Sequence, residues 1–368
     1  MSNDSAQPDD DRFRGYDLET GLLSRLREWN DVFPWIRLGR VLRVAASPPL
    51  ILLTAATLAI WFGGNLLLFG EVKHGMIAED GRPVLVAAEP FHFPESLYKS
   101  FWSLQSHLES VISTTVFHGE KSWVPLGQLL WSLLVWTPLA LLLARQGALL
   151  TAGRTMMGIG PLVKHSLSRT LGAWLAGLVP LACTAMIGLL LLPLGWIASF
   201  FPEPSVAVAP LALLAVLLAI PCGVLAFGAN FAVPLGWAAL ANESDPDSLD
   251  SLSRGYEYLF RRPLQLVLYA FVAFAILLIV GALAKGVAEA STWVAIVMLS
   301  RAGSPDQLIH SVRLVLSHFP NVIVLTLLWS LIGGIYLLLR HDTGGQEVED
   351  LWRPTPAPTP PLPKLPKP

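Results

Sequence analysis

The sequence predicts an all-α protein, a polytopic transmembrane helix bundle of about six spans with interfacial helices. Hydrophobic residues make up 53% of the 368 residues and charged residues only 14%, against about 25% charged residues in a typical soluble domain. The lysines, arginines, aspartates and glutamates fall between long apolar runs or at their ends. Since a helix of roughly 20 apolar residues crosses the hydrocarbon core, these runs predict membrane spans.

The apolar runs divide the chain into three regions. We expect a cytoplasmic, partly disordered N-terminal segment over residues 1–46, a membrane domain over 47–340 and a Pro-rich cytoplasmic tail over 341–368. Residues 71–123 form a polar insertion that we place on the outer face. The predicted spans cover residues 49–70, 124–144, 171–200, 206–240, 264–284 and 321–339.

Two apolar stretches do not fit a simple span. Residues 206–240 would extend about 52 Å as one straight helix, so we expect this run to tilt, break or project from the bilayer. Residues 293–300 are apolar but too short to cross it. For residues 285–319 we expect an interfacial or partly re-entrant segment, then a short helix over 307–318. A seventh crossing near Trp293 is the alternative.

A polar stretch over residues 242–263 separates the fourth and fifth spans. Asp245 and Pro246 are typical of a helix start. Apolar residues then recur at helical spacing and arginines gather toward the end, which predicts a helix in the membrane interface with its arginines toward lipid phosphates. A short linker helix of the soluble type is the alternative. The apolar face comprises Leu249, Leu252, Tyr256, Leu259 and Phe260, and the arginines are Arg254, Arg261 and Arg262.

The tetrapeptide SLSR occurs twice, at residues 166–169 and 251–254, each time between long apolar runs. This repeat predicts two related units, each an apolar helix, an interfacial helix and an apolar helix. Residues 35–43 alternate apolar side chains with arginines, which is typical either of a helix on an anionic membrane surface or of a basic flank of the first span. The candidate docking residues on the cytoplasmic side are Arg169, Arg254, Arg261 and Arg262.

The distribution of basic residues predicts the orientation. With six spans, 18 of the 25 lysines and arginines fall on the side that carries both termini and both SLSR segments. Because basic residues favour the cytoplasmic side of a membrane, we expect both termini in the cytoplasm.

The predicted spans contain few groups suited to coupled transport, which usually needs ionisable residues at membrane depth. Arg145 stands at a span boundary. The intramembrane polar candidates are Asn65, Gln128 and Asn230. We interpret them as interhelical hydrogen-bonding groups, and a substrate path past Asn230 is the alternative.

The sequence predicts no metal site, no cofactor and no nucleic-acid partner. Histidines of the outer insertion, together with Glu95 and Glu109, lack the spacing of a helical zinc site, and HExxH is absent. Gly158–Gly160 is not followed by the Lys-Ser/Thr of a phosphate-binding loop, and GxSxG does not occur. Cys183 and Cys222 fall within apolar runs, which is typical of buried thiols. The net charge is -2, whereas nucleic-acid binders concentrate basic surface. The histidines are His74, His92, His107 and His118.

A family of uncharacterised polytopic bacterial membrane proteins resembles this chain in two segments, PLGWAALANESDPDSLDSLSRGYEYLFRRPLQLVLY (Pro234–Tyr269) and IYLLLRHDTGGQEVED (Ile335–Asp350). A weaker likeness is to the membrane domain attached to some glycerophosphodiester phosphodiesterases, whose catalytic part has no counterpart in this sequence. The resemblance implies a bundle in the bacterial inner membrane and implies no activity.

These observations predict a non-catalytic integral membrane protein that acts as an interaction or scaffold component. Membrane lipids and an unknown protein are the expected partners. The tail, with PTPAPTPPLPKLPKP, is either a spacer or the ligand of an aromatic-lined groove. The alternative function is a permease-like subunit that moves a lipid or another apolar solute and docks a cytoplasmic ATPase through its elbow helices.

Overall fold

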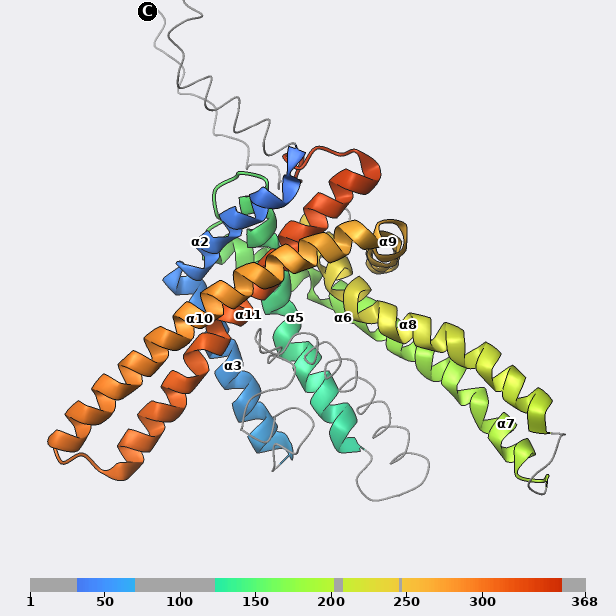
Figure 1. The fold of residues 1–368 in the computed structure, drawn as a ribbon, viewed down its shortest axis with the longest axis horizontal. Helices are drawn as coiled ribbons and strands as arrows, with labels where there is room; N and C mark the ends of the chain where they lie inside the picture. The colour runs from blue at the N-terminus through green and yellow to red at the C-terminus, as the bar shows by residue number, and fades with distance from the viewer. Residues whose placement is uncertain (1–31, 70–122, 202–207, 245–246, 353–368) are drawn as a thin grey trace, which may run out of the picture.

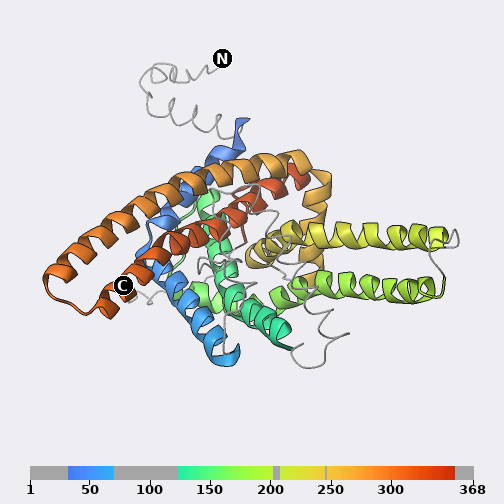
Figure 2. The ribbon, with the colours of Figure 1, turned by 60° about the horizontal axis from the view of Figure 1, so that its bottom comes forward.

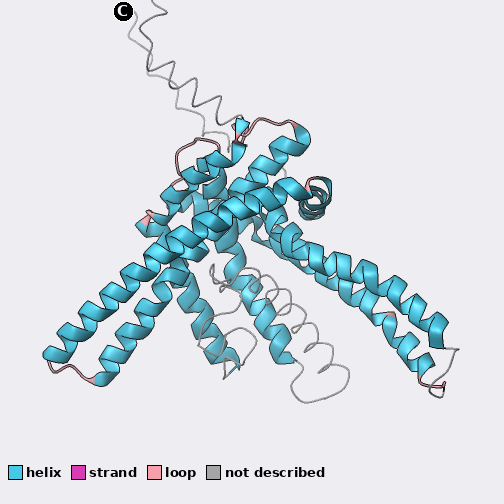
Figure 3. Ribbon diagram, in the orientation of Figure 1, coloured by secondary structure: helices cyan, strands magenta, loops and turns pink. Residues whose placement is uncertain are grey.

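The computed structural model describes residues 32–69, 123–201, 208–244 and 247–352, and within these residues the chain is helical and contains no strand (Figure 3). Six helices are long and apolar enough to cross a membrane, which confirms the all-α class and the expected number of spans. The outer insertion and its four histidines lie outside the described residues. The helices are the 3-10 helix η2 (Pro34–Val41), α2 (Leu42–Ala45), α3 (Pro48–Phe69), α5 (Trp123–Thr151), α6 (Ile159–Leu189), α7 (Leu191–Ala198), α8 (Val208–Asn242), α9 (Ser248–Arg261), α10 (Pro263–Arg301) and α11 (Asp306–Gly344).

The long helices run alternately in opposite directions between two ends of the molecule (Figure 1). One end, called the platform here, carries η2, the loop 152–158, α9 and the residues that follow α11. The opposite, distal end carries the turn 302–305. Two hairpins, α6–α7–α8 and α10–α11, diverge from the platform on either side of α3 and α5 (Figures 1 and 2).

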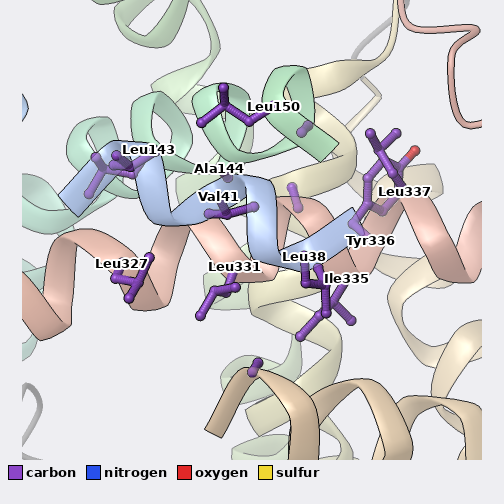
Figure 4. Packing of buried hydrophobic residues seen from close by; sticks show 14 of the residues in the cluster. Leu38, Val41, Leu143, Ala144, Leu150, Leu327, Leu331, Ile335, Tyr336 and Leu337 are labelled. Carbon is purple, nitrogen blue, oxygen red and sulfur yellow. The ribbon is translucent and has the colours of Figure 1, made fainter. Parts of the chain in front are cut away.

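The core lies where α5, α11 and η2 meet (Figure 4). The backbones of α5 and α11 touch there, because a Cβ added at Gly333 would overlap the carbonyl of Ala144, and one added at Gly147 would overlap that of Ser330. Small residues permit this close approach between membrane helices. The close contact between α5 and α11 therefore depends on the absence of side chains at Gly147 and Gly333.

The arginine-rich run before the first span is part of the core. Leu38, Val41 and Val44 are fully buried, and a Cβ at Gly334 of α11 would contact Leu38 and Val41. Leu38 and Val41 therefore face the protein, whereas Ile36 and Leu42 are exposed, and a contact of this run with the membrane surface stays a prediction. Packing against α11 removes the buried side chains from both water and lipid.

The re-entrant segment expected over residues 285–319 is wrong. α10 and α11 are continuous helices of 39 residues each, about 58 Å long, joined by a turn in which Gly303 has a φ of 67°. Charged groups such as Lys285 and Glu289 stay exposed on this hairpin, so they do not interrupt the helix. Because the hydrocarbon core is about 30 Å thick, the hairpin must tilt or extend beyond it.

The first SLSR copy forms no separate helix, which corrects the predicted pair of interfacial helices. Residues 166–169 lie inside α6, which is continuous for 31 residues. The second copy lies in α9, which ends because Pro263 lacks the N–H needed to continue it. The preceding residue, Arg262, leaves the helical region with a φ of -133°, as residues before proline tend to do.

The helix α9 packs on α8 through small residues. Its N-cap is Asp247, whose carboxylate accepts from the Leu249 N–H at 3.0 Å, and not Asp245 as expected. A Cβ at Gly255 would overlap the carbonyl of Ala232 on α8. Of the predicted apolar face, Leu252 is buried, Tyr256 and Leu259 are half-buried, and Leu249 and Phe260 are exposed. The placement of α9 in a membrane interface stays a prediction.

Candidate functional site

The polar side chains of the platform converge on Glu243, which follows α8 directly. Its carboxylate accepts from Arg254 of α9 and from the Tyr336 hydroxyl of α11. Its backbone carbonyl accepts from Arg169 of α6 at 2.6 Å. Arg169 and Arg254 are the last residues of the two SLSR copies, so the repeat brings two guanidinium groups to one residue. A second carboxylate, that of Asp250, binds Arg254 at 2.7 Å.

Burial and the charge of Glu243 shift the pKa values of Tyr258 and Arg254, both in α9. Burial, reinforced by the negative charge of Glu243, raises the pKa of Tyr258 to about 12. Burial lowers the pKa of Arg254, but Glu243 and Asp250 outweigh burial and the net direction is upward. Tyr258 is therefore a neutral phenol and Arg254 a permanent cation at physiological pH.

Arg145 occupies the centre of the platform, where its side chain is completely buried. It donates to the Asn242 amide oxygen at 3.1 Å and to the backbone carbonyl of Trp352 at 2.6 Å. Asn242 in turn donates to the Ala238 carbonyl at 2.7 Å. The sequence places Arg145 at the end of a span, whereas α5 continues through it to Thr151, and its guanidinium is hydrogen-bonded inside the protein.

Residues 345–352 fold back over the platform and form what we call the strap. Gly345 ends α11 with a left-handed φ of 63°, and its N–H donates to the His341 carbonyl at 2.8 Å. Glycine adopts this conformation without strain, which lets the chain reverse direction. Val348 and Leu351 are then buried against the bundle. The strap is thus a packed part of the platform.

Arginines from four elements hold the strap, mostly through its backbone. Arg154 donates to the carbonyls of Leu351, at 2.9 Å, and Glu349. Arg340 donates to the Asp350 carbonyl, and Arg145 to that of Trp352. Arg37 pairs with the Glu349 carboxylate at 2.7 Å. We call Arg37, Arg145, Arg154, Arg169 and Arg340 the arginine cluster.

Trp352 closes the strap against α6. Its ring lies 5.1 Å from the Arg169 guanidinium, in a cation–π contact. The other partner is the His165 ring, which stacks on it at a centroid distance of 5.8 Å. His165 also donates to the Ala241 carbonyl at 2.9 Å. The strap therefore contacts the same two α6 residues that bind the end of α8.

The structure separates the four candidate docking arginines into two pairs. Arg169 is buried and Arg254 is half-buried, and both bind groups of this chain. Arg261 and Arg262 are exposed, although Arg261 pairs with Glu257 at 2.7 Å. A docking role of these four arginines stays a prediction. A partner would reach the exposed pair, Arg261 and Arg262, directly.

The intramembrane polar candidates bond locally. Asn65 is buried and donates to the Trp61 carbonyl of its own helix at 2.9 Å. Asn230 donates to two carbonyls of its own helix, those of Ala226 and Phe227, each at 3.3 Å. Gln128 lies in α5, and its side chain is outside the described part. The hydrogen bonds given for Asn65 and Asn230 therefore do not connect different helices.

Tryptophans and threonines connect the helices instead. Trp61 donates to Ser132 at 2.9 Å, and Thr326 donates to Thr54 at 2.9 Å. Further indole donors reach backbone carbonyls of neighbouring helices, namely Trp131 to Trp61, Trp174 to Leu133 and Trp237 to Ala173. The sequence predicts Asn and Gln, and not indoles, as the groups that hydrogen-bond between helices. A buried indole nevertheless needs an acceptor, and that requirement was the available signal.

The fold defines the class of the protein, a multi-pass α-helical integral membrane protein. Among the described residues, no group of His, Cys, Asp and Glu is arranged to hold a metal ion, and both cysteines are free thiols. No family model, curated protein or solved structure matches the chain. The resemblance of Pro234–Tyr269 and Ile335–Asp350 to a family of uncharacterised polytopic membrane proteins stays a prediction, as does the weaker likeness to the membrane domain of glycerophosphodiester phosphodiesterases.

Proposed function

We propose that the protein is a non-catalytic scaffold of the bacterial inner membrane, with both termini in the cytoplasm and its Pro-rich tail as the docking peptide for a protein partner. The anchoring of the strap carries this proposal. Arginines from η2, α5, the loop 152–158 and α11 hold residues 349–352, directly before the proline-rich residues 353–368.

The anchor has a physical consequence for binding. Pro-rich peptides dock into aromatic-lined grooves in an extended conformation that costs little entropy to order. A peptide anchored in this way stays at the membrane surface, because the platform holds the residues that precede it. The basic residues of the platform, which favour the cytoplasmic side, support placing this surface in the cytoplasm.

Substitution of the tail prolines tests the proposal. Changing Pro358, Pro361, Pro363 and Pro366 to alanine should reduce the partner recovered after crosslinking in native membranes by about tenfold or more, because the groove-binding conformation is lost. The control changes Thr355 and Thr359 to alanine and should leave recovery unchanged. Equal recovery of every crosslinked protein by the proline variant and the wild type would contradict the proposal.

The alternative, a permease-like subunit, is favoured by one observation. Arg261 and Arg262 are exposed at the junction of α9 and α10, where a cytoplasmic ATPase would meet both hairpins. On this alternative, changing both residues to glutamate removes a co-purifying ATPase activity and leaves the thermal stability of the bundle unchanged. Purified membranes without any associated ATPase would eliminate the alternative and leave the scaffold proposal standing.

A further inference from the structure

The arginine cluster is unusual in what it binds. Arg37, Arg145, Arg169 and Arg340 are only 8%, 0%, 7% and 9% exposed, and Arg154 is half-buried. A charge buried in this way is costly unless strong partners satisfy it. Neutral backbone carbonyls of the strap are prominent among the acceptors that the structure gives these arginines. Guanidinium groups form stronger hydrogen bonds with anions than with neutral acceptors.

The arrangement of the donors suits an anion with several oxygens. Four guanidinium groups approach the strap from η2, α5, the loop 152–158 and α11 and meet over four consecutive residues, 349–352. The planar fork of arginine matches phosphate oxygens in particular. The chain from Arg145 to Thr170 contributes four basic residues and no acidic residue to this region. The strap itself brings Glu347, Glu349 and Asp350.

The strap has the properties of a tethered, replaceable occupant. The hydrogen bonds that Arg145, Arg154 and Arg340 donate to it go to carbonyl oxygens, and Arg37 pairs with the exposed Glu349 side chain. Its hold depends partly on tethering, since a short linker keeps an attached segment at an effective concentration on the order of millimolar. The chain passes from α11 into the strap at Gly344 and Gly345, and a Cβ at either one would meet nothing within 4 Å.

We propose that the arginine cluster is a binding site for a phosphate group and that the strap is its intrachain occupant, which leaves when phosphate binds. Arg145, Arg154 and Arg340 then donate to phosphate oxygens instead of to strap carbonyls. Trp352 leaves the faces of Arg169 and His165 in the same step. The phosphate belongs either to a soluble anion or to an anionic lipid headgroup at the platform surface, and the two sources share this chemistry.

Amide hydrogen exchange of the unsubstituted, full-length protein tests the proposal. In nanodiscs of zwitterionic lipid, inorganic phosphate should accelerate exchange of residues 346–352 by about tenfold or more, with chloride as the control at equal ionic strength. In nanodiscs that contain phosphatidylglycerol and no phosphate, the same acceleration identifies a lipid headgroup as the source. Acceleration in either arm supports the site. Unchanged exchange in both arms overturns it.

Cysteine labelling provides a second, independent measurement. Val348→Cys, with Cys183→Ala and Cys222→Ala, places a single buried thiol under the strap, and the anion that acts in the exchange experiment should increase its labelling by a water-soluble maleimide. Arg154→Gln should raise the phosphate concentration or the phosphatidylglycerol fraction at half-effect by at least about fivefold. The matched exposed variant Arg262→Gln should not. An equal shift in both variants would mean that general surface charge, not the cluster, binds the anion.

The phosphate site and the scaffold function of the tail are tested by independent experiments, so either proposal can be contradicted without the other. Loss of partner capture by the proline variant does not depend on any anion, and the strap exchange does not depend on any partner. A protein whose strap ignores phosphate still qualifies as a scaffold. A protein whose tail has no partner still qualifies as a phosphate-binding protein.

Discussion

Gly333→Leu should abolish the folded bundle in mild detergent. A leucine at this position would drive its Cβ into the backbone carbonyl of Ala144, at the crossing of α5 and α11. Overpacking a core usually costs about 1–3 kcal/mol because neighbouring side chains shift. Here the obstacle is backbone, which has no rotamer to change, so the helices must separate. With a total stability on the order of 5–15 kcal/mol, we expect loss of the monodisperse peak in fluorescence-detected size exclusion.

The chain offers matched controls for this prediction. Gly147→Leu attacks the same crossing from α5, against Ser330, and should give the same loss. Gly286→Leu lies in α10, where an added Cβ meets nothing within 4 Å. It should leave stability unchanged or raise it slightly, since glycine inside a helix costs about 1 kcal/mol. A wild-type thermal transition for Gly333→Leu would mean that α5 and α11 do not touch as described.

Hydropathy predicts the position of a membrane helix more reliably than it predicts the residues at which the helix begins and ends. Residues 206–240 were expected as one run, and α8 covers Val208–Asn242. The same reasoning fails for residues 285–319, because Lys285 ends an apolar run but α10 continues to Arg301. A helix continues as long as its backbone hydrogen bonds are made and no residue breaks it, whatever surrounds its side chains. Hydropathy indicates whether the side chains lie in lipid or in water, and it does not indicate whether the helix continues.

The candidate site was predicted in part, through the repeated tetrapeptide. The SLSR copies identified Arg169 and Arg254, but not that both bind Glu243, which lies 74 residues from Arg169. Local patterns do not encode a partner at such a distance. The sequence does not predict the strap. The sign of it in the sequence is the opposite charge of the basic residues 145–170 and the acidic QEVED after Gly345. Its fold also required the left-handed glycine, and the GG pair was the available sign.

Arg169→Glu should destabilise the platform, whereas Arg262→Glu should not. Arg169 is buried, donates to the carbonyls of Leu240 and Glu243, and lies over the Trp352 ring. A glutamate there would place a carboxylate against carbonyl oxygens and close to the Glu243 side chain. Leaving an uncompensated buried charge typically costs about 3–5 kcal/mol, which is a large share of the stability of an ordinary domain.

Thermal unfolding in detergent, followed by limited proteolysis at the strap, measures this effect. Arg169→Lys should be intermediate, because lysine keeps the charge but loses the planar guanidinium that stacks on the Trp352 ring. Arg262→Glu reverses an exposed charge and should unfold with the wild-type midpoint. If Arg169→Glu also kept that midpoint, the buried position of Arg169 would be wrong, and the residue would again be available for docking. Loss of a partner in Arg169→Glu indicates docking only if the fold survives, and the two exposed arginines provide the cleaner test because their substitution leaves the Glu243 contacts in place.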